Sequence, residues 1–100
     1  MDVTIQLRKP INLPNCLRQA GFHPIPGSWV RPLSGARYPR LHLYVEQANP
    51  TNCKLSLHID QKQTTLDMPG LKRHAGEYRS PVVMQEMERI QRWIEYAQRT

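Results

Sequence analysis

Residues 40–46, Arg-Leu-His-Leu-Tyr-Val-Glu, and residues 54–60, Lys-Leu-Ser-Leu-His-Ile-Asp, decide the fold of this chain. Both stretches alternate between apolar and polar residues, which is the pattern of a strand with one buried face. Residues 47–53 between them are rich in turn formers, so the pattern predicts a β-hairpin. One face carries the leucines and is predicted to form the core. The opposite face carries polar side chains, namely His42, Tyr44, Glu46, Ser56, His58 and Asp60.

The pairing of these two strands decides which polar side chains become neighbours. If Glu46 pairs with Lys54, the histidine of each strand lies opposite the other. A slip of two residues keeps the same face toward the core and places His42 beside Ser56 or Asp60 instead. The sequence leaves these registers open.

Further strands and helices are predicted on both sides of the hairpin. Alternation over residues 2–8 predicts a first strand at a sheet edge, and residues 13–20 predict a short helix between turn formers. Residues 28–31 predict a short irregular strand in a proline-rich segment. After Pro81, apolar residues recur every three or four positions and predict a long C-terminal helix.

The predicted order is β-α-β-β-β-α, which indicates a two-layer α+β sandwich. Its antiparallel sheet of three to four strands is expected to pack against the C-terminal helix and the short N-terminal helix. One hundred residues with 39% hydrophobic content suffice for one modest core, so residues 1–100 are predicted to form a single domain. Residues 61–79 are polar and are predicted to be mostly loop.

The lengths of the apolar segments and the spacing of the cysteines indicate the cellular compartment of the protein. No stretch approaches the roughly 20 apolar residues that cross a bilayer, and the first residues lack the order of a signal peptide. We therefore expect a cytoplasmic protein that does not bind a membrane. Cys16 and Cys53 belong to no CxxC pair and are expected to be reduced thiols.

The positive charge lies in the N-terminal half of the chain. The net charge is +6, and the segment from Val3 to Val45 has six basic residues and no acidic one. Arginine predominates among them, and its planar guanidinium suits phosphates. These observations favour a polyanionic partner, with nucleic acid ahead of a membrane surface. A basic surface that only keeps the protein soluble is the alternative.

Aromatic residues and arginines alternate around the proline-rich segment. This combination can stack bases and neutralise phosphates. The predicted nucleic-acid-binding residues are Trp29, Arg31, Arg37, Tyr38 and Arg40, with Tyr44 extending the surface. The alternative is that Trp29 and Tyr38 anchor the core or a loop.

The polar hairpin face also holds candidate metal ligands. His42, His58 and Asp60 share that face, and His74 with Glu77 follows in the next segment. Two histidines and a carboxylate suit zinc, iron or manganese, and a bound metal could support phosphodiester cleavage. No short ligand motif joins these residues, so a solvated sheet face is the alternative. The leading interpretation requires no cofactor.

Catalysis without a metal would use histidine as a general base. His58 or His74 could then act with Lys62 or Arg73 on an RNA 2′-hydroxyl, so the candidate catalytic residues are His42, His58 and His74. No serine lies in a G-x-S-x-G motif, and neither cysteine has an evident base nearby. Nucleophilic hydrolase chemistry is therefore not expected from the sequence.

A third class of function is protein interaction. Trp93 and Tyr96 lie beside the apolar stripe of the predicted C-terminal helix, and aromatic residues are enriched at interfaces. The first strand, at the sheet edge, offers pairing between two copies of the chain. A homodimer or a protein partner is therefore the alternative to nucleic acid.

Two resemblances accompany these patterns. From residue 13 to residue 100, the order helix, three strands, helix resembles the double-stranded-RNA-binding fold and the HicA-type mRNA interferase toxins. Those toxins carry a Gly-Ser-His signature with a catalytic histidine, whereas here Gly27-Ser28 is followed by Trp29. Segments 57–62, 74–78 and 83–90 resemble a small family of uncharacterised bacterial proteins.

The leading prediction is a basic RNA-binding domain without catalysis.

Overall fold

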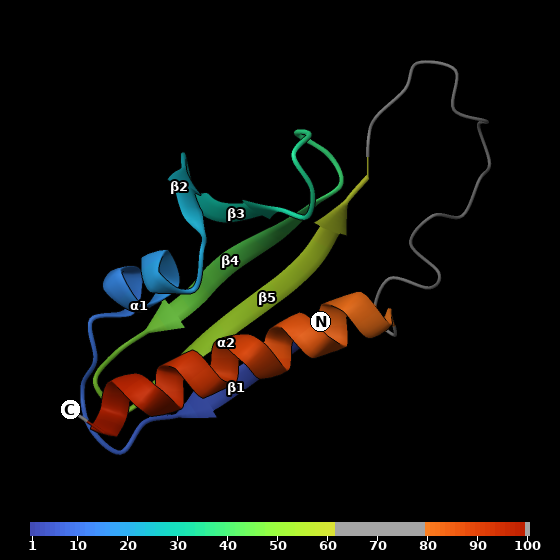
Figure 1. Ribbon diagram of the computed structural model, residues 1–100. Helices are drawn as coiled ribbons and strands as arrows, with labels where there is room; N and C mark the ends of the chain where they lie inside the picture. Colours follow the sequence, from blue (N-terminus) through green and yellow to red (C-terminus); the bar gives the residue numbers. More distant parts are fainter. Residues whose placement is uncertain (62–79, 100) are drawn as a thin grey trace.

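The computed structural model describes residues 1–61 and 80–99. Its elements are β1 (Asp2–Gln6), α1 (Leu13–Gln19), β2 (His23–Ile25), β3 (Ser28–Pro32), β4 (Arg40–Ala48), β5 (Asn52–Asp60) and α2 (Pro81–Arg99). The strands form one antiparallel sheet in the order β1-β5-β4-β3-β2. Figure 1 shows α2 running across one face of this sheet. The predicted α+β architecture, an antiparallel sheet with two helices, is confirmed.

The sheet has five strands, more than the three to four predicted. The extra strand is β2, which turns through Gly27 (φ 82°) and pairs with β3. Its central residue is Pro24, which cannot donate a ladder hydrogen bond and is tolerated because β2 is an edge strand. The prolines made this segment look irregular in the sequence.

The β4–β5 hairpin takes one of the registers that the sequence left open. His42 lies directly opposite His58, and Leu43 lies opposite Leu57. An irregularity between Val45 and Gln47 then shifts the register, so that Lys54 pairs with Gln47. Of the registers that the sequence left open, the one with His42 opposite His58 is formed, but Glu46 does not pair with Lys54 in it. A bulge of this kind inserts one extra residue in one strand.

The core lies between the sheet and the two helices. The inward leucines of β4 and β5 have no exposed surface, and the apolar stripe of α2 packs over them. Phe22 follows α1 and is 1% exposed, so it anchors the end of this helix in the core. The buried core residues include Leu17, Leu41, Leu43, Leu55, Leu57, Val83, Met87, Ile90 and Ile94.

The ends of α1 follow the sequence signals. The side chain of Asn12 accepts a hydrogen bond from the backbone N–H of Asn15 at 3.0 Å, and Gly21 takes a positive φ of 99° after the helix. Cys16 in α1 and Cys53 in β5 are free and buried, and burial raises the pKa of both thiols. Neither helix in the described part of the chain is long and apolar enough to cross a membrane.

Candidate functional site

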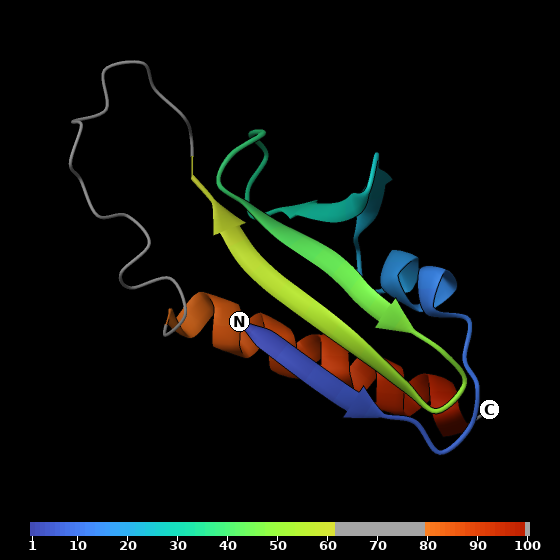
Figure 2. The same cartoon turned by 180° about the vertical axis from the view of Figure 1, so that it is seen from behind.

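The two faces of the sheet have different surroundings. Both helices pack on the apolar face, whereas Figure 2, seen from behind, shows no described helix over the other face. We call this second surface the open face. It carries the polar side chains of β4 and β5 together with Ser28 and Val30 of β3, because Val30 lies opposite His42.

A hydrogen-bonded chain crosses three strands on the open face. Ser28 Oγ in β3 lies 2.7 Å from His42 Nε2 in β4, and His42 Nδ1 lies 2.8 Å from Asp60 Oδ2 in β5. Arg40 Nε donates to the same Asp60 oxygen at 3.1 Å. The ring of Tyr44 stacks on His42 with 4.5 Å between the ring centroids. The imidazole of His42 is therefore held at both nitrogens and on one ring face.

The chemistry of Asp60 fixes the direction of this chain. An ionised carboxylate only accepts hydrogen bonds, so His42 Nδ1 carries a proton and donates to Asp60. In the neutral ring, Nε2 then has a free lone pair and accepts from the hydroxyl of Ser28. In the neutral form of His42, the hydroxyl proton of Ser28 therefore points at a base that a carboxylate orients.

A second serine and histidine on the open face, Ser56 and His58, form a hydrogen bond in which the histidine is the donor. Ser56 Oγ donates to Asp2 Oδ1 at 2.7 Å and lies 2.9 Å from His58 Nε2. Because the single hydroxyl proton of Ser56 is directed to Asp2, His58 donates to Ser56 through Nε2. The hydrogen bond from Ser56 lowers the pKa of Asp2. Ser56 therefore has no histidine that accepts its proton.

The structure brings together three of the four predicted metal ligands. His42, His58 and Asp60 all lie on the open face, but His42 and Arg40 already bind the carboxylate of Asp60. Within residues 1–61 and 80–99, no group of three or more His, Cys, Asp or Glu side chains is placed to hold a metal ion. His74 lies outside the described residues, so a site that includes it stays a prediction.

The predicted nucleic-acid-binding residues lie on two opposite faces. Trp29 and Arg31 project toward the helices, where Trp29 packs against the core and Arg31 lies 3.9 Å from Glu86 of α2. Arg40 and Tyr44 project to the open face. The remaining two precede β4: Arg37 is exposed, and the ring of Tyr38 lies 5.0 Å from the guanidinium carbon of Arg40. These six residues therefore do not form one continuous surface.

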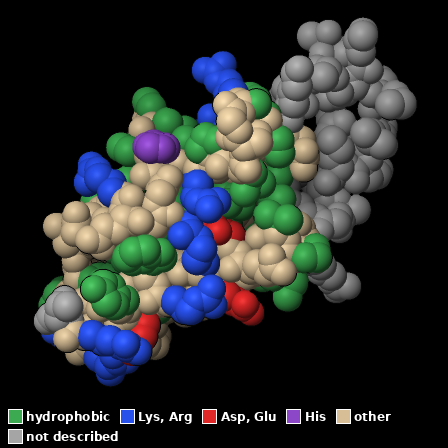
Figure 3. All heavy atoms as spheres, in the orientation of Figure 1, with side chains coloured by type: hydrophobic (Ala, Val, Ile, Leu, Met, Phe, Trp, Pro, Cys, Tyr) green, Lys and Arg blue, Asp and Glu red, His purple; other side chains and the backbone are tan. Residues whose placement is uncertain are grey.

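A different set of arginines and aromatic residues gathers on the helix side. Figure 3 shows Lys and Arg side chains along this face with few acidic ones between them. Two pockets there, of about 560 and 460 Å³, share Arg89 and Arg92 as lining residues. We call this region the α2 arginine surface and define it by Arg31, Arg89, Arg92, Trp93 and Tyr96.

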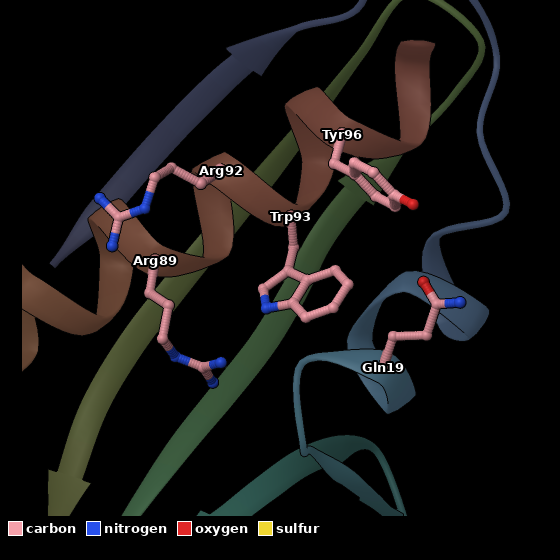
Figure 4. A pocket seen from close by; sticks show the side chains of 5 residues that line it. All are labelled: Gln19, Arg89, Arg92, Trp93 and Tyr96. Carbon is pink, nitrogen blue, oxygen red and sulfur yellow. The ribbon is translucent and has the colours of Figure 1, made fainter. Parts of the chain in front are cut away.

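The larger pocket combines cationic and aromatic groups. Figure 4 shows the indole of Trp93 between α2 and α1, with Gln19 of α1 lining the same pocket. Trp93 and Tyr96 make an edge-to-face contact with 6.0 Å between their ring centroids. Tyr96 is 55% exposed, and Arg92 has no ion pair or hydrogen bond with any residue of the described ranges. This pocket can therefore offer a free guanidinium beside the exposed ring of Tyr96 and the half-buried ring of Trp93.

Arg89 is held in place by its neighbours. It donates to both carboxylate oxygens of Glu86, at 2.9 and 2.7 Å, and to the backbone oxygen of Ala20 after α1. The hydrogen bond to Glu86 raises the pKa of Arg89. Arg89 therefore joins α2 to α1 and stays charged at the edge of the pocket.

The sequence interpretation missed Ser28 and the arginines of α2. Arg89 and Arg92 lie three positions apart, and this helical spacing could have placed them on one face. Ser28 had no comparable signal, because the register between β3 and β4 was not readable from the proline-rich segment. No protein family, curated protein or solved structure matches the chain. The geometry of its own residues must therefore support any functional assignment.

Proposed function

We propose that the protein binds single-stranded RNA through the α2 arginine surface. The observation that carries this proposal is the pocket that Arg89, Arg92, Trp93 and Tyr96 line together. Guanidinium groups bind phosphates, and exposed aromatic rings stack on unpaired bases of any sequence. An open pocket with both kinds of group suits a flexible strand better than a rigid duplex.

The surrounding charge supports the same partner. Arg31 of β3 lines the adjoining pocket, and Arg18 of α1 lies 5.4 Å from the ring centre of Trp29. Glu86 and Glu88 offset part of this positive charge. Arg18 and Arg31 of the basic N-terminal half therefore lie on the same side of the sheet as the arginines of α2. A cytoplasmic location, where RNA is accessible, belongs to this proposal.

Fluorescence anisotropy with a labelled single-stranded RNA tests the assignment across a series of salt concentrations. Arg92→Ala should weaken binding to every sequence and reduce the slope of log affinity against log salt by about 0.7, the contribution of one phosphate contact. Tyr96→Ala should lose about 1–3 kcal/mol of binding free energy, as expected for one stacked base.

Two variants on the open face are the matched controls. Lys54→Ala removes an equal charge from an exposed position of β5 and should leave the affinity and its salt slope unchanged. Arg40→Ala is the second open-face variant and should also leave the affinity unchanged. Arg31→Ala, on the helix side, should weaken RNA binding. If Lys54→Ala and Arg40→Ala weaken binding as much as Arg92→Ala, the proposed surface is wrong. RNA that does not bind even at low salt contradicts the proposed function.

Protein interaction is the second candidate for the same surface. The exposure of Tyr96 beside Trp93 supports it, because exposed aromatic residues are enriched at the centres of interfaces. The partner could be a second copy of the chain. Sedimentation velocity over a range of concentrations distinguishes the candidates: a dimer that Tyr96→Ala dissociates, without RNA binding, favours this one.

A further inference from the structure

We propose that the open face is an esterase site, in which Ser28 is the nucleophile, His42 its general base and Asp60 the residue that orients His42. This activity lies on the face of the sheet opposite the α2 arginine surface and does not depend on RNA binding. The chemical class of substrate is a small carboxylic ester.

The geometry of the three side chains matches these roles. A serine nucleophile needs a base within hydrogen-bond reach, and the base in turn needs a group that fixes its tautomer. Ser28 Oγ is 2.7 Å from His42 Nε2, and His42 Nδ1 is 2.8 Å from Asp60 Oδ2. Such a triad is recognised by geometry and roles and not by sequence position. The absence of a G-x-S-x-G motif therefore does not exclude it.

The surroundings hold these groups in place. Arg40 donates to Asp60, and Tyr44 stacks on the imidazole, so the base cannot rotate freely. The side chain of His42 is 14% exposed and Ser28 is 8% exposed, which limits water without enclosing the site. Tyr44 is 39% exposed and offers an apolar ring beside the nucleophile. We expect a partly exposed site of this kind to accept a small acyl group.

The proposed reaction transfers an acyl group in two steps. Ser28 Oγ attacks the ester carbonyl carbon while His42 Nε2 takes the hydroxyl proton. The bond from the carbonyl carbon to the alkoxy oxygen then breaks, and His42 returns the proton to the leaving alcohol. Water attacks the acyl-serine with His42 again as the base, which releases the carboxylic acid and restores the serine hydroxyl.

Ser56 provides an internal comparison on the same face. Its hydroxyl proton is directed to Asp2, so His58 faces it as a donor and not as a base. Ser28 and Ser56 thus have similar distances to a histidine but opposite directions of hydrogen bonding. The proposal therefore requires Ser28 to react and Ser56 to remain inert.

A fluorophosphonate probe tests this directly on the full chain. Displacement of fluoride by Ser28 Oγ leaves a stable phosphonyl adduct, which intact-mass and peptide mass spectrometry locate. We expect an adduct on Ser28 in the wild-type protein. Ser28→Ala and His42→Gln should each reduce the labelling rate by about two orders of magnitude or more. Ser56→Ala should be labelled like the wild type.

Hydrolysis of p-nitrophenyl acetate provides the second measurement. We expect a burst of p-nitrophenolate as the acyl-enzyme accumulates, and its loss in Ser28→Ala. Surface nucleophiles also cleave this ester, so Lys54→Ala and Ser56→Ala, both on the open face, serve as controls that should keep the burst. A wild-type protein that forms no adduct overturns the proposal, as does labelling that persists in Ser28→Ala. If His42→Gln fails to fold by circular dichroism, Asp60→Asn replaces it and should slow the labelling.

Discussion

Glu86 is the residue on which the arginines of the helix side depend. It is 6% exposed, and it accepts hydrogen bonds from Arg89 while lying 3.9 Å from Arg31. A buried carboxylate is tolerated here because two guanidiniums offset its charge and its oxygens are hydrogen-bonded. Glu86 therefore reduces the positive charge of the α2 arginine surface but fixes the position of Arg89.

Removing this carboxylate should destabilise the protein. Glu86→Gln leaves Arg89 without its ion pair in a partly buried position, so we expect the free energy of unfolding to fall by about 1–3 kcal/mol. Glu88→Gln is the matched control, because Glu88 is exposed on the same helix, and its effect should stay within about 0.5 kcal/mol. Urea denaturation measures both. An equal loss of unfolding free energy in the two variants would contradict the stabilising role of the Glu86–Arg89 ion pair.

At the scale of single elements, β1 shows how an edge strand is held. It pairs with β5, and its first residues add two polar contacts: the amino group of Met1 donates to the backbone oxygen of Leu57, and Ser56 donates to Asp2. The hydrogen bond from Ser56 is the largest cause of the lowered pKa of Asp2. The attachment of β1 is therefore coupled to the charge of one carboxylate.

This coupling predicts a dependence on pH. Because the pKa of Asp2 is lower in the folded protein than in the unfolded chain, its contribution to stability is present above the unfolded pKa and is lost as the pH falls through the folded one. Ser56→Ala should raise the pKa of Asp2 toward its ordinary value. Carboxyl carbon NMR titration measures this shift, and the pKa of Glu95, which the Arg8 hydrogen bond lowers, should not move. An unchanged pKa of Asp2 in Ser56→Ala would contradict the hydrogen bond from Ser56 as its main cause.

At the scale of the whole molecule, the two layers depend on α2. Its stripe of Val83, Met87, Ile90 and Ile94 covers the apolar face of the sheet, and three of these side chains have no exposed surface. The rest of the helix lies outside this contact and supplies the arginines and aromatic rings of the proposed RNA site. One element therefore builds both the core and the candidate surface.

Two methionines of α2 test this division. Met87 is 2% exposed and Met84 is 43% exposed. Met87→Ala should lower the free energy of unfolding by about 2–5 kcal/mol, because it removes buried contacts and leaves a cavity. Met84→Ala should change it by no more than about 0.5 kcal/mol. Thermal and urea unfolding of both variants measure the difference, and a large effect of Met84→Ala would contradict the placement of this helix.

Much of the fold could be predicted because its signals are local. Alternation over β4 and β5 fixed which side chains are buried, and the three- and four-residue spacing after Pro81 fixed the inward face of α2. The caps of α1 at Asn12 and Gly21 were equally readable. The β2–β3 hairpin was not, because its prolines suppress the ordinary strand pattern and only pairing with β4 makes it regular.

The sequence by itself determined the α+β class and the apolar face of the sheet, since each follows from the period of a helix or a strand. Only the tertiary structure decided what lies beside what across longer separations. It placed Trp29 and Arg31 on the helix side, away from Arg40 and Tyr44, because neighbouring residues of a strand point to opposite faces and β3 joins the sheet in one register. It also joined Ser28, His42 and Asp60, which come from three strands. Such contacts depend on strand order and hydrogen-bond direction, which no local pattern encodes.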